Sequence, residues 1–442
     1  RLPPARLEDV VEMPPDRPAP RAVRLLQARG GDRGQPEPHA HGAARGHHQP
    51  VVSRRLGAGP GRVHRPGLPR QTVPDRFVAE QGAALGVLGL ILDPLYSMLP
   101  LTGALGEISW GTSNEFLLVA IPLFIMLGEI LLRSGMAERM YNAMSLWLSW
   151  LPGGLMHANI GASALFAATS GSSVATAATV GTVALPQIKK QGYNEPLFLG
   201  SLAAGGTLGI LIPPSINLVI YGVLTNTSVP KLYLAGIIPG LGMALLFMLT
   251  IAAACMVKPK WGGAKIQTSW SQRFASLVHL VPPLGIFLLV VGSIYAGIAT
   301  PTEAAALGVV GALLLAAFSG RMNWKMIKEV LEGTMKATAM IMLIVIGSAF
   351  LNFVMSATGL TNALTDAITG LGVSPMVMLM IIVVFYLVLG CFMETLSMMI
   401  TTIPIVAPIM IALGFDPVWL GIAIIILVEV ALITPPVGLN LF

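Results

Sequence analysis

Two short polar segments interrupt long apolar stretches and are the clearest candidates for chemistry in this sequence. Residues 169–176 (TSGSSVAT) are small and rich in hydroxyl groups, and residues 209–215 (GILIPPS) contain two consecutive prolines. Glycine permits a tight reversal of the chain, and proline lacks the amide hydrogen that a helix needs. Both segments therefore predict breaks that leave hydroxyl and carbonyl oxygens free, which are ligands that suit a hard cation such as Na⁺. The amide groups at the new helix N-termini would suit an anionic substrate.

A similar pair of segments lies near the C-terminus. Glu394 and Thr395 fall inside a second interrupted apolar stretch, and residues 434–436 (TPP) form a second proline break. A carboxylate within a membrane segment is a candidate functional group because burying an unpaired charge is costly. Glu394 is therefore expected to complete a second cation site, whereas Glu429 fits a functional role and a protonated structural role equally well. The competing interpretation of these segments is close helix packing through small residues.

Other acidic residues have local structural explanations. Thr300, Pro301 and Glu303 match a capping box, with Thr as the N-cap, Pro as the first helical residue and Glu as the third. Glu129 and Arg133 are four residues apart near a predicted helix end, so an ion pair within one helix is expected. The sequence has no nucleotide-binding loop, HExxH motif, catalytic triad pattern or metal-ligand cluster, so an enzyme is not expected and transport would draw on an ion gradient.

The elements that must hold these residues are membrane helices. Of the 442 residues, 54% are hydrophobic and only 11% are charged, whereas soluble globular domains carry about 25% charged residues. The net charge of +6 arises entirely from residues 1–80, which hold 14 Arg and 8 acidic residues. The remaining residues are electrically balanced, so the composition gives no indication of nucleic-acid binding by the folded part.

Residues 1–80 differ from everything that follows them. They are rich in Arg, Pro, Gly, Ala and His, contain no Lys, and lack helical or alternating periodicity, so they are predicted to be disordered. Because the composition changes abruptly at Gln81, this segment is expected to be a misassigned or out-of-frame translation that replaces a first transmembrane helix. A metal site at His39, His41, His47 and His48 is the alternative, but no other ligands converge on these histidines.

Apolar stretches long enough to span a bilayer follow from residue 82 onward. Two further stretches, 155–187 and 374–410, are interrupted in mid-run and are predicted to be re-entrant hairpins. The uninterrupted or proline-broken spans are predicted at residues 82–101, 116–133, 196–225, 232–257, 274–298, 302–319, 334–356 and 418–442.

The charges of the connecting loops predict the orientation. Three loops are basic: Lys189–Lys190, residues 258–273 and residues 321–328. The loops between them, at 225–228, 299–302 and 355–358, carry no Lys or Arg. The positive-inside rule places the basic loops in the cytoplasm. The alternation holds through the chain only if each interrupted stretch returns to the side from which it entered, which independently favours hairpins.

An internal repeat with an offset of 222 residues organises the chain. Pro186 pairs with Pro408, residues 192–194 (GYN) pair with 414–416 (GFD), and residues 211–214 (LIPP) pair with 433–436 (ITPP). Repeat 1 covers about 116–225 and repeat 2 about 334–442, and the loop charges place the two halves in opposite orientations. The sequence thus predicts an all-α polytopic membrane protein, an inverted repeat with two re-entrant helical hairpins and two broken helices, typical of a secondary carrier.

Several segments resemble the large membrane subunit of tripartite ATP-independent periplasmic (TRAP) transporters, and the resemblance covers essentially residues 82–442 within a predicted membrane domain at 81–442. The segments are AIPLFIMLGEILLRSGMAERM (120–140), SGSSVATAATVGTVALPQIKKQGY (170–193), LGILIPPSINLVIYG (208–222), LYLAGIIPGLG (232–242), TPTEAAALG (300–308) and ITPPVGLNLF (433–442).

The resemblance implies an elevator-type carrier of the ion-transporter superfamily in the bacterial inner membrane. It implies two protein partners, a small four-helix membrane subunit and a periplasmic solute-binding protein that delivers the solute. It also implies import of a small organic anion coupled to two or more Na⁺, with no catalytic residue and no organic cofactor. The anion is left open between a C4-dicarboxylate, a keto acid, a sugar acid and a sialic acid.

The resemblance also implies positions for the bound ions and the substrate. A first Na⁺ site would use the hydroxyls and backbone around Ser170, Ser172, Gly209, Ile212 and Pro214. A second Na⁺ site would use Glu394, Thr395 and the backbone around Ala431, Thr434 and Pro436. The substrate would lie between the hairpin tips, near Gly171, Ser173, Thr176 and Thr395.

Two departures and two alternatives accompany this interpretation. Residues 1–80 stand in place of the family's first helix, and the chain is expected to be truncated because it stops at Phe442, inside the last broken helix. The first alternative is a single-component ion-coupled organic-anion carrier of the same superfamily, which would need no binding protein. The second is an ion channel, which the inverted hairpins disfavour.

Overall fold

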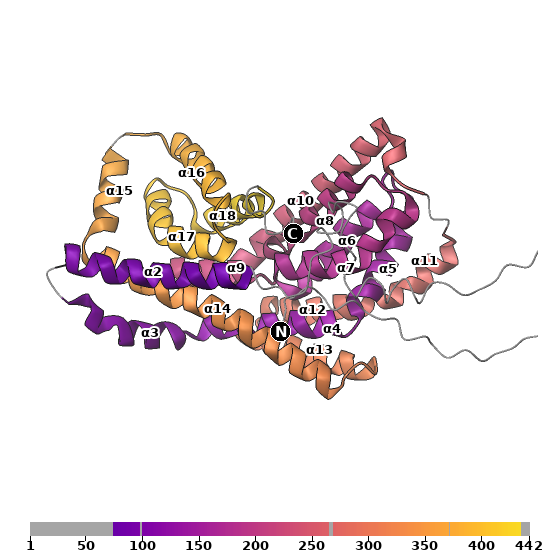
Figure 1. Ribbon diagram of the computed structural model, residues 1–442, viewed down its shortest axis with the longest axis horizontal. Coiled ribbons are helices and arrows are strands. Elements are labelled where there is room, and N and C mark those ends of the chain that lie inside the picture. Colours follow the sequence, from indigo (N-terminus) through magenta and orange to yellow (C-terminus); the bar gives the residue numbers. More distant parts are fainter. Residues whose placement is uncertain (1–73, 98–99, 265–267, 371, 435–442) are drawn as a thin grey trace, which may run out of the picture. The chain divides into compact units, whose positions relative to one another are not determined.

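The helices begin and end where the prolines, glycines and capping residues of the sequence place them. The computed structural model describes residues 74–97, 100–264, 268–370 and 372–434. These residues form α-helices and short 3₁₀ helices (Figure 1). Residues 1–80 were predicted to be a disordered and misassigned segment, and the first 73 of them lie outside the described residues. The helix α2 begins at Pro74 and not at residue 82, so residues 74–80 belong to a helix, which proline at a first helical position favours.

The first half of the chain holds one hairpin and one broken helix. A 3₁₀ helix, η3 (Phe116–Val119), leads into α4 (Ala120–Arg133), and α5 (Met136–Leu148) connects α4 to the hairpin. The remaining helices of this half are α6 (Leu155–Ser170), α7 (Ser173–Gln191), α8 (Glu195–Leu211), α9 (Ile216–Thr225) and α10 (Val229–Val257).

In the second half, three further helices precede a long helix, a connector and a second hairpin. The helices are α11 (Trp270–Ser276), α12 (Val281–Tyr295), α13 (Pro301–Phe318), α14 (Trp324–Ala357), α15 (Leu360–Gly370), α16 (Pro375–Gly390), α17 (Thr395–Ala412) and α18 (Pro417–Leu432). Between α2 (Pro74–Tyr96) and η3 lie the short helices η2 (Leu101–Ala104) and α3 (Leu105–Ser113). The predicted span at 418–442 is described only as far as residue 434.

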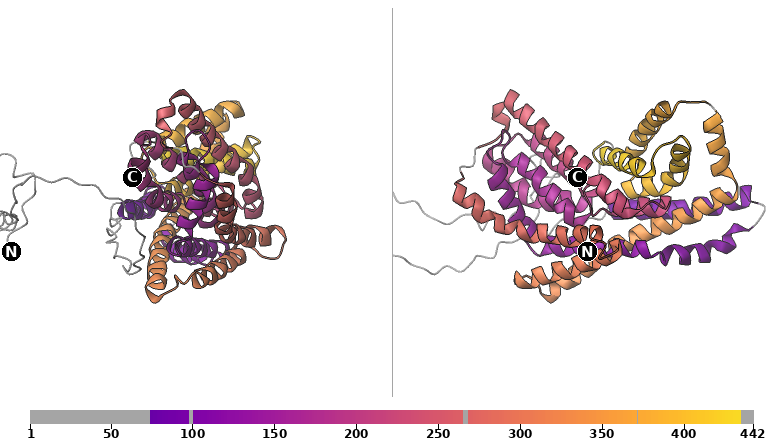
Figure 2. Two further views of the ribbon diagram at one scale, coloured as in Figure 1. Left: turned by 90° about the vertical axis from the view of Figure 1, so that its right-hand side faces the viewer. Right: turned by 180° about the vertical axis from the view of Figure 1, so that it is seen from behind.

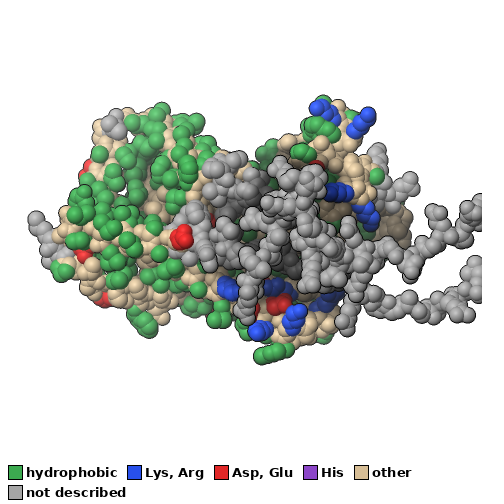
Figure 3. Space-filling model, viewed as in Figure 1, with side chains coloured by type: hydrophobic (Ala, Val, Ile, Leu, Met, Phe, Trp, Pro, Cys, Tyr) green, Lys and Arg blue, Asp and Glu red, His purple; other side chains and the backbone are tan. Residues whose placement is uncertain are grey.

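Within the described residues, five helices are long and apolar enough to cross a membrane, or up to seven if each of two bent pairs is one span. The bent pairs are α8 with α9, at 41°, and α11 and its 3₁₀ extension with α12, at 43°. Figure 3 shows hydrophobic side chains covering much of the visible face, whereas Lys and Arg gather beyond one end of α10 and around the α13–α14 turn. This separation of lipid-compatible surface from charge agrees with a multi-pass membrane protein.

The long helix α14 starts ten residues earlier than the predicted span at residue 334. Its first turns carry the pairs Lys325–Glu329 and Lys328–Glu332, each spaced by four residues with 4.0 Å between charged atoms. Such ion pairs stabilise a helix that is exposed to water, so α14 begins with polar turns before its apolar part. Helix α2 lies along α14 (Figures 1 and 2), where Gly82 and Gly347 bring the two backbones close together.

Equivalent positions of the sequence repeat adopt the same local structure. Gly192 and Gly414 both end a helix with positive φ, at 70° and 93°. Asn194 then caps α8 by accepting a hydrogen bond from Leu197 N, and Asp416 caps α18 by accepting one from Trp419 N. The helices that follow these caps begin at Glu195 and Pro417, which are also 222 residues apart.

Candidate functional site

The first interrupted stretch folds into two helices that meet at a tight turn. Helix α6 ends at Ser170, and Gly171 adopts φ 64°, a left-handed conformation that costs glycine little. Ser172 is extended and caps α7, because its Oγ accepts a hydrogen bond of 3.4 Å from Ala175 N. The structure thus has the predicted helix–turn–helix arrangement, with hydroxyl groups concentrated at the turn.

These hydroxyl groups form a small buried network. The Oγ of Ser170 lies 3.1 Å from Oγ1 of Thr176, and Thr176 Oγ1 donates to the carbonyl oxygen of Ser172 at 2.7 Å. Ser170, Ser173 and Thr176 are all buried. The turn is therefore a cluster of mostly buried oxygen atoms within an apolar protein, and such oxygen atoms are possible ligands for a cation.

The second interruption breaks the neighbouring helix at its two prolines. Helix α8 ends at Leu211 and α9 starts at Ile216. In a continuous helix the amides of residues 213 and 214 would donate to the carbonyls of Gly209 and Ile210, but proline has no amide hydrogen. The Oγ of Ser215 donates to the Ile210 carbonyl instead, and accepts from Leu218 N as the cap of α9. The Gly209 carbonyl is thus left without its helical donor.

The hairpin tip and the helix break are in direct contact. The carbonyl oxygen of Gly171 lies 3.5 Å from the amide nitrogen of Ile216, the first residue of α9. Gly209 packs so closely beneath the tip that a Cβ atom there would lie 2.5 Å from the carbonyl oxygen of Ser172. A Cβ on Gly171 would likewise lie 2.7 Å from the Pro214 carbonyl oxygen. Both glycines are therefore needed for this close approach.

The five residues predicted for the first Na⁺ site come from these two contacting segments. Ser170 and Ser172 lie at the tip, and Gly209, Ile212 and Pro214 lie at or beside the break. The amide of Ile212 still bonds to Leu208 O, so Ile212 offers its carbonyl only. In the described residues no group of three His, Cys, Asp or Glu side chains is placed to hold a metal. Any cation here would be bound by hydroxyl and carbonyl oxygens, the donors that suit Na⁺.

The second interrupted stretch is also a hairpin, and Glu394 caps its second helix. Helix α16 ends at Gly390 and α17 begins at Thr395. The Glu394 carboxylate accepts hydrogen bonds from Leu396 N at 2.9 Å, Ser397 N at 3.1 Å and Thr395 Oγ1 at 2.8 Å. Both of its oxygens are therefore engaged in the helix start, where the helix dipole favours a negative charge.

The second break is described only in part. Ala431 packs against Gly390, so the end of α18 contacts the end of α16. Thr434 Oγ1 donates to Val430 O at 2.7 Å, and Pro436 lies outside the described residues. The residues predicted for the second Na⁺ site are thus near a hairpin end, but the proline break that would complete the site is not described.

A side chain that the sequence interpretation missed links the two halves. Asn217 is buried in the first turn of α9, and its amide nitrogen lies 3.4 Å from Met399 Sδ in the second hairpin. At the far end of α9, Tyr221 OH donates to Pro417 O at the start of α18. An amide in the otherwise apolar sequence INLVIYG was a signal that could have been recognised.

Glu429 is buried in α18, and neither of its carboxylate oxygens has a hydrogen-bond partner among the described residues. The hydrogen-bonded structural role considered for Glu429 thus has no partner within this part of the chain.

The structural roles predicted for Glu303 and Glu129 are confirmed. Thr300 and Glu303 form the capping box, and Arg133 Nη2 lies 2.9 Å from Glu129 Oε2.

Comparison with known proteins identifies relatives along most of the chain. The family model described as "Tripartite ATP-independent periplasmic transporter, DctM component" matches residues 79–442. The C4-dicarboxylate TRAP transporter large permease protein of Pseudomonas aeruginosa is 38% identical over 332 residues, which cover 75% of this chain and 77% of that protein. The sialic acid TRAP transporter large permease protein of Vibrio cholerae is 33% identical over 338 residues, covering 75% and 78%.

Two further comparisons extend this result. The ectoine TRAP transporter large permease protein of Halomonas elongata is 32% identical over 329 residues, covering 74% of this chain and 76% of that protein. The crystal structure of the Alcanivorax borkumensis YdaH transporter matches with a TM-score of 0.54 and 17% identity, over 83% of this chain and 90% of that chain, which supports the fold. The chain belongs to the TRAP transporter family as a large permease of the DctM type, a non-enzymatic multi-pass protein of the inner membrane.

Proposed function

We propose that this permease imports small organic anions together with Na⁺, receiving them from a periplasmic solute-binding protein and working with a small membrane subunit. The observation that carries the proposal is the contact of the first hairpin tip with the α8–α9 break. There the turn that carries the paired hydroxyls of Ser170 and Thr176 packs against the segment broken by Pro213 and Pro214, with Gly209 against Ser172 and Gly171 against Pro214. Such broken helices within the membrane are used by secondary transporters to bind ions and substrates.

The charge of the substrate would be met without a basic side chain. Residues 169–176, 209–216 and 391–397 contain no Lys or Arg. The positive ends of helices α7, α9 and α17 start at these segments, and a helix N-terminus attracts anions through its free amides and dipole. Co-bound Na⁺ would supply the remaining positive charge, which makes anion binding and Na⁺ binding mutually dependent.

The matching caps of the two halves support an inverted repeat and an elevator movement. In this proposal both hairpins and both broken helices slide as one body against the helices α2, α4, α13 and α14. The connectors α5 and α15 would join the two bodies. Each connector follows a glycine with positive φ, Gly135 at 72° and Gly359 at 75°, a conformation that suits a joint.

The relatives are named for the transport of three different solutes, C4-dicarboxylate, sialic acid and ectoine, so the comparison does not select one solute for this chain. We favour an organic acid because the helix N-termini at the tips suit a carboxylate. The test is uptake of radiolabelled succinate, pyruvate and sialic acid into proteoliposomes that contain the permease and its small subunit. We expect uptake of one acid that requires both an inward Na⁺ gradient and the cognate binding protein. Uptake without the binding protein would indicate a single-component carrier. Uptake without Na⁺ would contradict the proposal that the protein has Na⁺ sites.

A further inference from the structure

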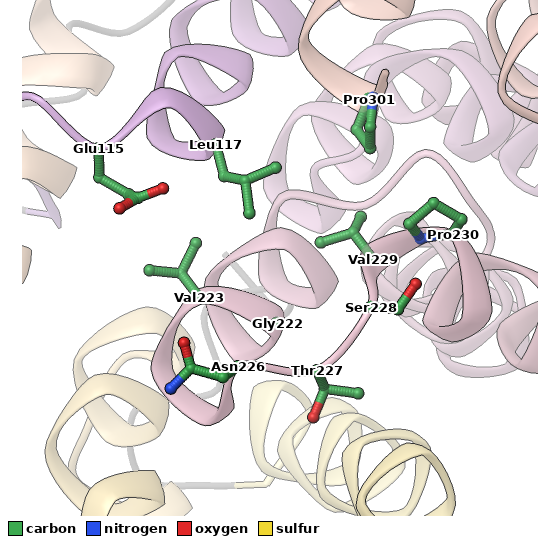
Figure 4. A pocket seen from close by; sticks show the side chains of 10 residues that line it. All are labelled: Glu115, Leu117, Gly222, Val223, Asn226, Thr227, Ser228, Val229, Pro230 and Pro301. Carbon is green, nitrogen blue, oxygen red and sulfur yellow. The ribbon is translucent and has the colours of Figure 1, made fainter. Parts of the chain in front are cut away.

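A pocket of about 440 Å³ opens at the C-terminal end of α9, whereas the hairpin tip contacts the N-terminal end of this helix. Figure 4 shows its walls: Glu115 and Leu117 come from the start of η3, Val223 and Asn226 from the end of α9, and Pro301 from the start of α13. The start of α10 closes the pocket with Val229. The walls therefore belong to helices from both of the bodies that the proposed elevator movement would separate.

The pocket faces the periplasm. The helices α4, α10 and α13 all begin beside it, and each ends close to a basic residue. Arg133 ends α4, Lys258 follows α10 and Arg321 follows α13. Helix α10 also has Lys231 in its first turn, so its charges alone do not orient it. Because basic residues mark the cytoplasmic side of an inner-membrane protein, the opposite ends of α4 and α13, and with them the pocket, are periplasmic.

The lining of the pocket suits a long cationic side chain. Among the described residues that line the pocket, Glu115 alone is charged; it is exposed, and its carboxylate does not cap η3. Leu117, Val223 and Val229 point into the space beside it (Figure 4). A lysine or arginine has an apolar stem for such walls and a charged head for the carboxylate. A lipid headgroup fits less well, because its ammonium group is tied to a phosphate that Glu115 would repel.

We propose that this pocket receives a lysine or arginine side chain of the solute-binding protein when that protein docks, an inference that rests on the proposed function. Helix α9 connects the pocket to the candidate solute site: Gly222 lines the pocket, while Ile216 meets the Gly171 carbonyl at the hairpin tip. Ten residues of helix span about 15 Å. A side chain that fills the pocket therefore presses on one end of a short rigid helix whose other end forms part of the site.

The first test measures docking directly. The permease and its small subunit are placed in lipid nanodiscs, and the dissociation constant of the cognate solute-binding protein is measured at low and physiological salt. Losing one charge pair at an interface should raise the dissociation constant about fivefold for Glu115→Gln, and reversal in Glu115→Lys should raise it more than tenfold. Glu107→Gln is the matched control, because Glu107 is exposed on α3 and does not line the pocket.

Equal affinity of the wild type and both Glu115 variants would overturn the proposal while leaving the proposed function intact. A compensating Lys→Glu or Arg→Glu change on the binding protein that restores docking to Glu115→Lys would support it and identify the contact. A wild-type complex whose uptake is indifferent to the binding protein would contradict the proposed function itself. The two failures are therefore distinguishable.

The second test probes the pocket chemically. In a Cys255→Ala, Cys391→Ser background, Val223→Cys is treated with aminoethyl or sulfonatoethyl methanethiosulfonate. We expect the cationic reagent to react several times faster, the preference to vanish with Glu115→Gln, and the bound solute-binding protein to protect the thiol. Protection by phosphatidylethanolamine vesicles alone would assign the pocket to a lipid headgroup and overturn the proposal.

Discussion

Ser172 and Glu394, 222 residues apart, each cap the second helix of a hairpin, but they do so with different strength. The Ser172 hydroxyl accepts one long hydrogen bond of 3.4 Å from Ala175 N. The Glu394 carboxylate accepts two backbone hydrogen bonds, of 2.9 Å and 3.1 Å, as well as one from Thr395 Oγ1. The Ser172 hydroxyl can therefore give up its weak hydrogen bond and bind a cation at little cost. The Glu394 carboxylate would have to lose several hydrogen bonds to the start of its helix.

We predict that Ser172→Ala raises the Na⁺ concentration for half-maximal uptake about tenfold, because a lost ligand of the proposed cation site is not replaced. The measurement is uptake as a function of Na⁺ in proteoliposomes, with expression and thermal stability followed in parallel. Ser163→Ala is the control, since Ser163 is a buried serine of the same hairpin whose hydroxyl has no partner among the described residues. An unchanged Na⁺ dependence in Ser172→Ala would remove Ser172 from the site.

Glu394→Ala should destabilise the protein by about 1–2 kcal/mol, because the first amides of α17 lose their acceptor. Glu394→Asp should retain most of the stability, since aspartate is a good N-cap. Thermal unfolding in detergent compares the two variants with the wild type. If both substitutions are equally harmless, the hydrogen bonds from Leu396 N and Ser397 N contribute little, and the carboxylate must be explained by ion binding instead.

The sequence predicted the features of this fold that depend on local chemistry. The reversal at Gly171, the break at Pro213 and the capping box of Thr300 with Glu303 are each determined by a few neighbouring residues, and all are present. The start of α14 was misplaced because a search for apolar spans does not see the charged first turns, which paired side chains such as Lys325 and Glu329 stabilise.

Contacts between distant segments were harder to predict. The role of Glu394 as a cap was hidden because an acidic residue in an apolar stretch suggested an ion site, although the next residues also begin a helix. The contact of Asn217 with Met399 joins helices from the two halves, and no local pattern records such a pairing. The predicted ligands and substrate residues remain predictions: the structure shows where these residues lie, except for Pro436, but not what they bind.

Arg133→Ala should lower the stability by about 1–3 kcal/mol, because it leaves Glu129 partly buried without its ion pair. Arg133 also donates to the Glu329 carbonyl at 3.2 Å, which ties the end of α4 to α14. Lys328→Ala is the control and should cost less than about 0.5 kcal/mol, since the Lys328–Glu332 pair is exposed. Equal melting temperatures of the two variants would mean that the Glu129–Arg133 pair does not hold the helices together.

Gly209→Ala tests the contact that carries the proposed function. A methyl group at this position would meet the Ser172 carbonyl oxygen at 2.5 Å and Ser173 Cα at 2.7 Å, so the hairpin tip must move away from the α8–α9 break. We expect a loss of stability of about 1–3 kcal/mol from overpacking, and a larger loss of Na⁺-dependent uptake because the oxygen atoms of the site separate.

Gly200→Ala provides the matched control for this substitution. Gly200 lies in the same helix, and a Cβ there would meet nothing within 4 Å. Replacing glycine by alanine inside a helix should stabilise it by about 0.5–1 kcal/mol, so this variant should unfold at a slightly higher temperature than the wild type. Its transport should be normal, because the added methyl group contacts nothing. Thermal unfolding and Na⁺-driven uptake, measured on both variants, separate helix propensity from tip packing. If Gly209→Ala behaved like Gly200→Ala in both assays, close contact between the hairpin tip and the break would not be required for transport.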